Sequence, residues 1–169
     1  MIYCFDTYYF GEKANTACIG ISDWNDETVS FEKVEIISGI QEYESGSFYK
    51  RELPCILSIL DNLKLNSETD FIVIDGYVVL DDSGKMGLGG YLFEHLNQQI
   101  PIVGVAKNDY PKIDKMKRKL FRGNSKKALY ITAIGIDLDL AAEKILSMHG
   151  AFRFPTILKI VDQKSRDIL

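Results

Sequence analysis

A short segment that is apolar until its last residue, FIVID at residues 71–75, most constrains how this chain can fold. A strand without alternating polar side chains fits best inside a sheet that is covered on both faces. A second segment of this kind, IPIVGVAK at residues 100–107, predicts another buried strand. Two such strands with a helical segment between them favour an α/β sheet that carries helices on both sides.

The remaining segments predict the order of the elements. Three stretches rich in β-branched and aromatic residues, separated by turn residues, predict a meander of three strands, and apolar residues at helical spacing predict an amphipathic helix. This order is that of a ribonuclease H-like fold, an α/β mixed sheet with three antiparallel N-terminal strands and then parallel strands, flanked by helices. The predicted elements are strands at 1–10, 14–22 and 28–36, a helix at 51–64, the strand at 71–75, a helix at about 86–98, strands at 100–107 and 128–134, a helix from Asp137 to Met148 and a last helix opened by Pro155.

The composition is that of an ordinary globular protein. The 169 residues fit one domain, 1–169, and the 46% hydrophobic and 26% charged residues argue against extended disorder. No apolar run approaches the roughly 20 residues that a membrane span needs, so we expect a soluble, cytoplasmic protein without a membrane partner. Three scattered cysteines and two histidines make a zinc site hard to assemble, so any metal should be bound by oxygen.

The basic residues are concentrated in one segment. The net charge is −4, but residues 112–127, KIDKMKRKLFRGNSKK, hold eight Lys or Arg and one Asp, or +7, which leaves 12 basic and 23 acidic residues, or −11, elsewhere. Such a segment can follow a phosphate backbone, with Lys117, Arg118 and Arg122 as candidate ligands. It can equally be a solvated loop, and composition alone does not decide between the two.

Three carboxylates stand where they can meet at one end of the sheet. Asp6 interrupts the first strand, where a charge needs solvent, a partner or a metal. Glu52 begins the first helix, where the helix dipole is an alternative reason for an acid, and Asp75 ends the central strand, where ligand crevices form but turn aspartates also occur. Converging carboxylates repel one another without a cation, and oxygen ligands select Mg²⁺ or Mn²⁺.

A lysine follows the second buried strand at the same edge of the predicted sheet. Lys107 ends the segment IPIVGVAK. Its ammonium can bind a scissile phosphate or the charge that develops on it, while a metal can activate water and stabilise the same phosphodiester. The alternative is a lysine that only ends a strand.

Four strings carry a resemblance to a known family: YESGSFYKRELP, VIDGYVV, IPIVGVAK and FRFPTILKIVDQKSR. In this order and spacing they resemble endonuclease V, the DNA and RNA repair nuclease that recognises deoxyinosine or inosine. The most specific pieces are YxxGxxxxRE, with Tyr43, Gly46, Arg51 and Glu52, and the pair DG and GVAK. The resemblance implies a nuclease that uses Mg²⁺, with Mn²⁺ as a substitute, to hydrolyse a phosphodiester near deaminated adenine in DNA or RNA.

The resemblance also implies the catalytic residues. Asp6, Glu52 and Asp75 match the metal ligands of the family, in the first strand, the first helix and the DG motif. Lys107 matches the lysine of GVAK. Asp162 matches an acidic or histidine position on the last helix that faces the metal site in the family.

Further positions concern the nucleic acid. Tyr43 matches an aromatic residue of the family's strand-separating wedge, where a ring can insert beside a weakly paired lesion; the alternative is a core tyrosine. Gly46 belongs to the same motif. Gly76, Gly87 and Gly104 lie near the predicted pocket, where the missing side chain lets a flipped base approach the backbone.

The chain departs from the family pattern after Asp75. The family commonly continues DGHG and then HPR, whereas this chain reads DGYV and then DDS. We therefore expect Asp81 to replace the family's catalytic histidine, or Asp82 if an apparent insertion before Gly87 falls earlier. A carboxylate can bind metal or position water, but it cannot donate as a cationic histidine does.

Three functions are compatible with the sequence. The first is a monomeric, metal-dependent endonuclease of the endonuclease V type, favoured by Asp6, Glu52, Asp75 and Lys107. The second is a non-catalytic relative that binds nucleic acid, which the altered segment 77–83 permits. The third is a ribonuclease H-like nuclease that acts on branched or structured DNA with the same metal chemistry.

Overall fold

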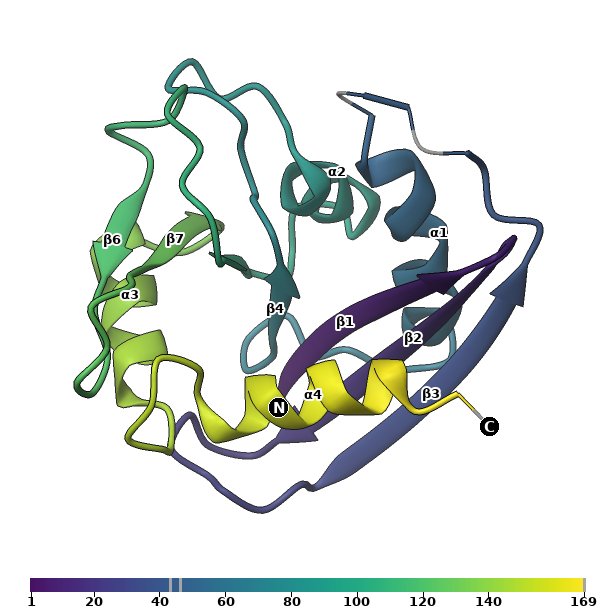
Figure 1. The fold of residues 1–169 in the computed structure, drawn as a ribbon, viewed down its shortest axis with the longest axis horizontal. Helices are drawn as coiled ribbons and strands as arrows, with labels where there is room; N and C mark the ends of the chain where they lie inside the picture. The colour runs from purple at the N-terminus through teal and green to yellow at the C-terminus, as the bar shows by residue number, and fades with distance from the viewer. Residues whose placement is uncertain (43, 46, 169) are drawn as a thin grey trace.

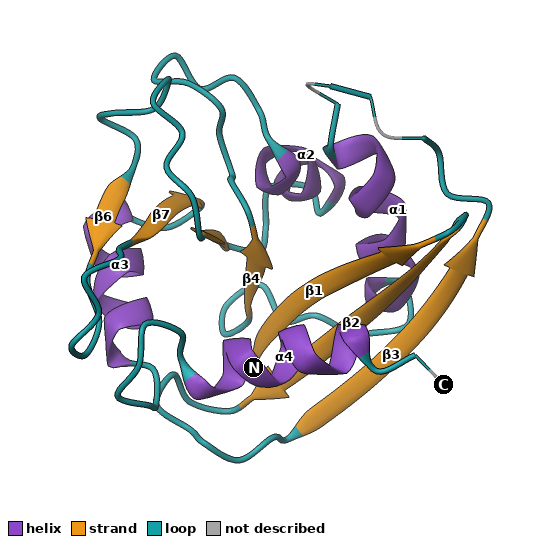
Figure 2. Ribbon diagram, in the orientation of Figure 1, coloured by secondary structure: helices purple, strands orange, loops and turns teal. Residues whose placement is uncertain are grey.

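The computed structural model describes residues 1–42, 44–45 and 47–168. Within these residues, seven strands form one mixed sheet in the order β3-β2-β1-β4-β5-β7-β6, with four helices around it (Figures 1 and 2). The strands are β1 (Ile2–Phe10), β2 (Lys13–Ile21), β3 (Phe31–Ser38), β4 (Phe71–Asp75), β5 (Ile102–Ala106), β6 (Arg118–Leu120) and β7 (Leu129–Ile134). The helices are α1 (Tyr49–Leu60), α2 (Leu88–His95), α3 (Leu138–Ser147) and α4 (Thr156–Arg166).

The central part of the sheet confirms the predicted arrangement. Strands β1, β2 and β3 form an antiparallel meander. β4 pairs parallel to β1, and β5 pairs parallel to β4. Parallel neighbours place their carboxyl ends at the same edge of the sheet, and that edge is where Asp75 ends β4.

The segment FIVID is covered on both faces, as its composition predicts. Val73 packs with residues of α3 and α4, whereas Ile72 and Ile74 pack with residues of α1 and α2. All three side chains are buried. Figure 1 shows α4 lying across β1 and β2, on the face opposite α1. Among the described residues, no helix has both the length and the apolar character that crossing a membrane requires.

Three elements differ from the sequence-based expectation. β7 runs antiparallel to β5, because the connection over 107–128 contains no helix that would carry the chain back to the start of β5. The short strand β6 lies inside the basic segment and pairs with β7. α2 ends at His95 because Asn97 and Gln98 adopt positive φ angles, 55° and 58°, which a helix cannot contain.

Candidate active site

Three carboxylates from three elements reach the same end of the sheet. β1 and β4 run parallel with Phe5 opposite Ile74, so the next residues along the two strands, Asp6 and Asp75, lie at the same level. Glu52 stands in the first turn of α1 and is only 3% exposed, and Asp6 is 6% exposed. The structure therefore brings together the residues that the sequence predicts as metal ligands.

Burial raises the pKa of each of these carboxyl groups, and repulsion from a neighbouring carboxylate adds to each rise. Burial is the main cause for Asp6 and lifts its pKa to about 7, although a hydrogen bond from Ser165 opposes the rise and Asp75 adds to it. Burial, then repulsion from Asp75 and Asp6, raises the pKa of Glu52 well above its usual range. Burial also raises the pKa of Asp75, against the ammonium of Lys107. A bound cation would favour the charged forms and oppose all three shifts.

Ser165 on α4 is a site residue that the sequence analysis missed. Its hydroxyl donates to Oδ2 of Asp6 at 2.5 Å, and its side chain is fully buried. Its backbone carbonyl accepts a hydrogen bond from Nδ2 of Asn15 at 2.7 Å, which ties this turn of the helix to β2. Ser165 comes three positions after Asp162, so the two share a helix face, and this spacing was the available signal.

Lys107 and Asp162 form an ion pair in the wall of a cleft that Asp6 and Asp75 also line. Nζ of Lys107 lies 3.5 Å from Oδ1 of Asp162, and Nε of Arg166 lies 3.3 Å from the same oxygen. Repulsion from Asp162 raises the pKa of both Asp6 and Asp75. We call this hollow the carboxylate cleft; its walls include Asp6, Asp75, Lys107, Phe154, Lys159 and Asp162.

The three carboxylates fit a hard divalent cation by their chemistry. Asp6, Glu52 and Asp75 offer only oxygen atoms, which Mg²⁺ and Mn²⁺ prefer, and burial is the main cause that raises the pKa of each. In the part of the chain that the structure describes, no group of three or more His, Cys, Asp or Glu side chains is arranged to hold a metal ion.

A second hollow begins one residue beyond Asp75. We call it the tyrosine pocket; its walls include Phe48, Tyr49, Tyr77, Leu80, Tyr110 and Lys112. Tyr77 donates a hydrogen bond to the carbonyl of Asn108 at 2.5 Å, and its ring centroid lies 5.8 Å from that of Tyr110. The sequence analysis did not single out either tyrosine, because they come from separate loops.

The predicted glycines have different positions relative to this pocket. Gly76 and Gly87 line it, as expected. Gly104 lies behind its wall, where an added Cβ would be 2.5 Å from the carbonyl oxygen of Gly76. Tyr43 and Gly46 lie outside the described residues.

The comparison with protein families decides the relationship of this chain. The family model described as Endonuclease V matches residues 1–135. The chain belongs to the endonuclease V family. As a member of this family it is a nuclease, a hydrolase of phosphodiester bonds. No curated protein sequence matches the chain.

Solved structures of endonuclease V share the fold at low sequence identity. Human endonuclease V is 21% identical, with a TM-score of 0.78 and coverage of 98% of this chain and 82% of that chain. The protein from Ciona intestinalis, solved with a 24mer DNA containing an inosine followed by a ribo-adenosine, is 17% identical, with a TM-score of 0.79 and coverage of 98% and 84%. The protein from Bacillus subtilis is 19% identical, with a TM-score of 0.71 and coverage of 98% and 78%.

Asp81 does not line the carboxylate cleft. It lies in the loop between β4 and α2. Its Oδ1 accepts hydrogen bonds from the backbone N–H and hydroxyl of Ser83, at 2.9 Å and 2.6 Å, and from the N–H of Lys85 at 3.0 Å. These bonds lower the pKa of Asp81. The structure thus places Asp81 in its own turn, which its carboxylate closes, and does not support it as the replacement for a catalytic histidine.

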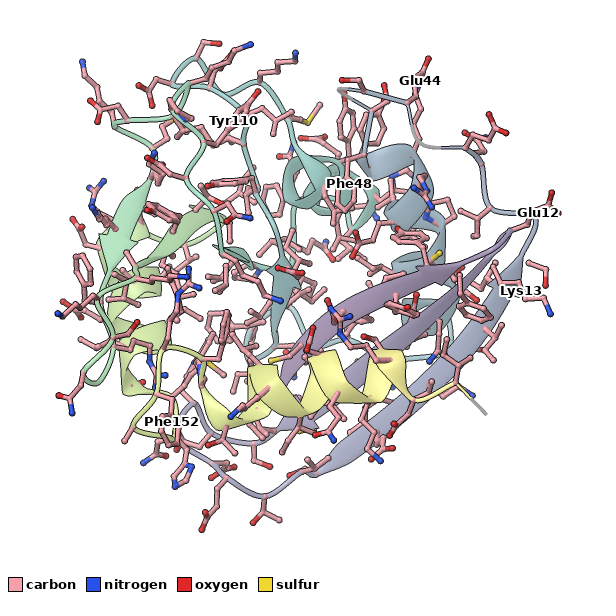
Figure 3. All side chains as sticks on the ribbon, in the orientation of Figure 1. Glu12, Lys13, Glu44, Phe48, Tyr110 and Phe152 are labelled. Carbon is pink, nitrogen blue, oxygen red and sulfur yellow. The ribbon has the colours of Figure 1, made fainter. Side chains whose placement is uncertain are left out.

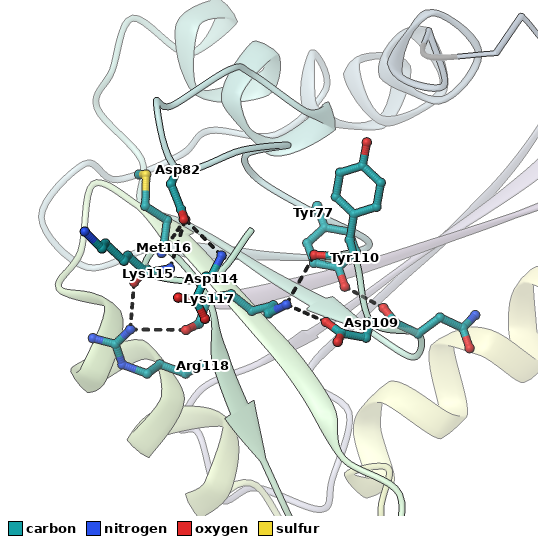
Figure 4. A network of polar contacts seen from close by, with 10 residues as sticks. Tyr77, Asp82, Asp109, Tyr110, Asp114, Lys115, Met116, Lys117 and Arg118 are labelled. Carbon is teal, nitrogen blue, oxygen red and sulfur yellow. Dashed lines mark hydrogen bonds and ion pairs between the residues drawn. The ribbon is translucent and has the colours of Figure 1, made fainter. Parts of the chain in front are cut away.

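Asp82 joins two segments that are distant in the sequence. Its Oδ1 accepts hydrogen bonds from the successive backbone N–H groups of residues 114, 115 and 116, at 3.0, 2.9 and 3.1 Å (Figure 4). These bonds lower the pKa of Asp82. The two segments that it joins carry Leu80 and Tyr110, which lie in the wall of the tyrosine pocket. Asp82 therefore links two segments of the wall of this pocket, and the structure does not place it in the carboxylate cleft.

The cations predicted to bind phosphate are engaged within the chain. Lys117 forms an ion pair with Asp109 and donates to the carbonyl of Tyr110 at 3.2 Å (Figure 4). Nε of Arg118 lies 2.6 Å from Oδ1 of Asp139. A phosphate would have to compete with these carboxylates, so neither residue presents an open binding group.

Arg122 is a structural residue. Its side chain is buried, with the whole residue 3% exposed. The guanidinium donates to backbone carbonyls, at 2.6 Å to Phe152, 2.7 Å to Met148 and 3.1 Å to Gly150. The expectation that Arg122 binds nucleic acid is corrected, because its donors hold the loop between α3 and α4.

Proposed function

We propose that this chain is a divalent-metal-dependent endonuclease that hydrolyses a phosphodiester bond near deoxyinosine or inosine, in the repair of deaminated bases. The observation that carries the proposal is the cluster of buried carboxylates beside Lys107. A pocket with aromatic walls begins at Gly76, the residue after Asp75 of this cluster. Membership of the endonuclease V family supports it. So does the relative from Ciona intestinalis that was solved with inosine-containing DNA.

Asp6, Glu52 and Asp75 would hold Mg²⁺, with Mn²⁺ as a substitute. When bound, the cation supplies activation of water and stabilisation of charge on the phosphate. The chain itself fixes Asp6 through Ser165, whose hydroxyl donates to it. The ammonium of Lys107 adds a positive charge at the mouth of the same cleft, where it would bind the scissile phosphate.

The tyrosine pocket would receive the deaminated base. A flipped base stacks well on an aromatic face, and the rings of Tyr77 and Tyr110 in the wall of the pocket supply such faces. Gly76 and Gly87 leave backbone close to the bound base. Tyr43 stays the proposed wedge residue. We further propose that residues 1–169 act as one monomeric nuclease domain on DNA, with RNA as an alternative substrate.

A cleavage assay tests this function. The protein would be incubated with Mg²⁺ or Mn²⁺ and matched oligonucleotides that contain deoxyinosine, inosine, uracil, a flap or no lesion. We expect incision near deoxyinosine or inosine, and a loss of at least about a hundredfold in Asp75→Asn with folding retained. Asp81→Asn is the matched control, because it removes a nearby loop carboxylate outside the carboxylate cleft.

Four results would contradict the proposal or a part of it. Tight binding without incision of any substrate would exclude the enzyme and favour a binding protein. Normal cutting by Asp75→Asn would show that the metal ligands lie elsewhere, and a loss in Asp81→Asn as large as that in Asp75→Asn would return Asp81 to the catalytic group. Incision of the flap alone would favour a nuclease for branched DNA.

A further inference from the structure

Two phenylalanine rings project into solvent from neighbouring loops. Phe152, in the loop between α3 and α4, is 70% exposed (Figure 3). Phe121, directly after β6, is 51% exposed. Burying a ring of this kind contributes about 2 kcal/mol. Two rings left in water close to a catalytic cleft therefore suggest a surface that is covered when a partner binds.

The loops that carry these rings are fixed to each other. Arg122, next to Phe121, donates to the carbonyl of Phe152 at 2.6 Å. Gly123 packs so closely against the other loop that an added Cβ would lie 2.0 Å from the carbonyl oxygen of Ala151. The two rings are thus presented from a joined base, which reduces the ordering that binding would require.

A lysine accompanies each ring. Nζ of Lys119 lies 5.4 Å from the ring centroid of Phe121, and Nζ of Lys159 lies 5.3 Å from that of Phe152. Lys159 also lines the carboxylate cleft. Aromatic faces combined with cations are the features that bind single-stranded nucleic acid without reading its sequence.

A groove rich in cations continues from the carboxylate cleft. We call it the basic groove; its walls include Lys107, Lys119, Lys126, Lys127 and Arg153. Lys107 lines both hollows, so they adjoin at the residue expected to bind the scissile phosphate. Asp109 also lines the groove, but it is paired with Lys117. The charge of the groove is therefore complementary to a phosphate backbone.

We propose that the basic groove and the two exposed rings bind the unpaired stretch of the substrate strand that flanks the scissile phosphate. Lys119, Lys126 and Lys127 contact its phosphates, and Phe152 and Phe121 stack on its bases. A base inside a duplex is already stacked and has no free face for these rings, so the occupant is a single strand. The inference rests on the proposed function in placing the scissile phosphate at Lys107.

Binding of a single strand without a lesion tests the inference apart from catalysis. A labelled oligonucleotide of about 12 nucleotides without inosine would be titrated with the full chain in EDTA and followed by fluorescence anisotropy. We expect Phe152→Ala to weaken binding about five- to 150-fold and Phe152→Trp to restore it, because base stacking on an aromatic ring has that magnitude. Ile36→Ala is the matched control, because Ile36 is 52% exposed and lies on β3, at the edge of the sheet opposite β6. This variant should bind the oligonucleotide as wild type does.

The salt dependence of binding tests the phosphate contacts separately. Replacing Lys126 and Lys127 together by alanine should reduce the slope of log affinity against log salt by about 1.4, because each phosphate contact with a single strand contributes about 0.7. A blunt duplex of the same sequence should bind equally to wild type and to Phe152→Ala. Circular dichroism would verify that each variant folds, and Phe121→Ala provides a second test of stacking.

Unchanged single-strand binding by both phenylalanine variants would overturn the inference. So would an equal loss for duplex and single strand, or a salt slope that does not change. The probe contains no inosine and the buffer no metal, so these results do not depend on cleavage. A chain that binds the single strand through Phe152 but never cuts inosine substrates would refute the proposed function while confirming this surface.

Discussion

Replacement of Asp6 by asparagine should stabilise the metal-free protein. Asp6 is 6% exposed, and burial is the main reason that its pKa rises from 3.8 to about 7. One pKa unit corresponds to about 1.4 kcal/mol, so the charged form costs the folded state about 4 kcal/mol. Asparagine removes the charge and keeps an oxygen that accepts the hydrogen bond from Ser165.

The stabilisation should depend on pH in a defined direction. A carboxyl whose pKa is raised by folding binds its proton more tightly in the folded state, so wild type loses stability as the pH rises from about 4 through about 7. Asparagine stays neutral over this range. The difference in free energy of unfolding between Asp6→Asn and wild type should therefore grow by about 3 kcal/mol between pH 5 and pH 8.

Urea unfolding of both proteins in EDTA at the two pH values measures this difference. Groups that do not interact with Asp6 titrate alike in both proteins and cancel. Asp81→Asn is the control, because hydrogen bonds lower the pKa of that exposed carboxyl, so its replacement should give no gain at pH 8. Replacing EDTA by Mg²⁺ should reduce the advantage of Asp6→Asn, since only wild type keeps the full ligand set. A difference that is the same at pH 5 and pH 8 would refute the reasoning from burial.

Two further predictions concern residues that support the site. Gly104→Ala should lower the free energy of unfolding by about 1–3 kcal/mol, because its Cβ would lie 2.5 Å from the carbonyl oxygen of Gly76 and 2.6 Å from Oγ1 of Thr132; an unchanged urea midpoint would contradict this. Arg122→Met should lower it by about 2–4 kcal/mol, since three backbone carbonyls lose their donor. Arg118→Met, which removes an exposed ion pair, should cost less than about 1 kcal/mol, and equal losses in the two arginine variants would contradict the assignment of Arg122.

The parts of the fold that could be predicted from the sequence are those that short segments determine by themselves. The apolar segment FIVID required cover on both faces, and helices on both sides of β4 supply it. The N-cap was readable at Asp137, whose side chain accepts from the N–H of Leu140. The direction of β7 was not readable, because it depends on a connection without a helix, and strand composition carries no direction.

The candidate site also has a part that could be predicted from the sequence and a part that could not. Asp6, Glu52 and Asp75 could be predicted to converge because each has a place in the order of elements. The hydrogen-bond partners of Asp81 and the burial of Arg122 could not be predicted from the sequence. Backbone groups of its own turn bind Asp81, and carbonyls of a distant loop bind Arg122. A charged residue in a sequence is expected to be exposed. Arg122 is buried because carbonyls of a distant loop accept hydrogen bonds from its two terminal nitrogen atoms.

The contact made by Asp82 has a consequence for how substrate choice can change. One carboxylate oxygen links the loop before α2 to residues 114–116, and Leu80 and Tyr110 belong to the two linked segments. A graft that imports only one of these segments from a relative would leave three N–H groups, or the carboxylate itself, without a partner. The two segments that form the walls of the tyrosine pocket should therefore be exchanged together. A natural variant that changes only one of these segments should be selected against unless it keeps Asp82.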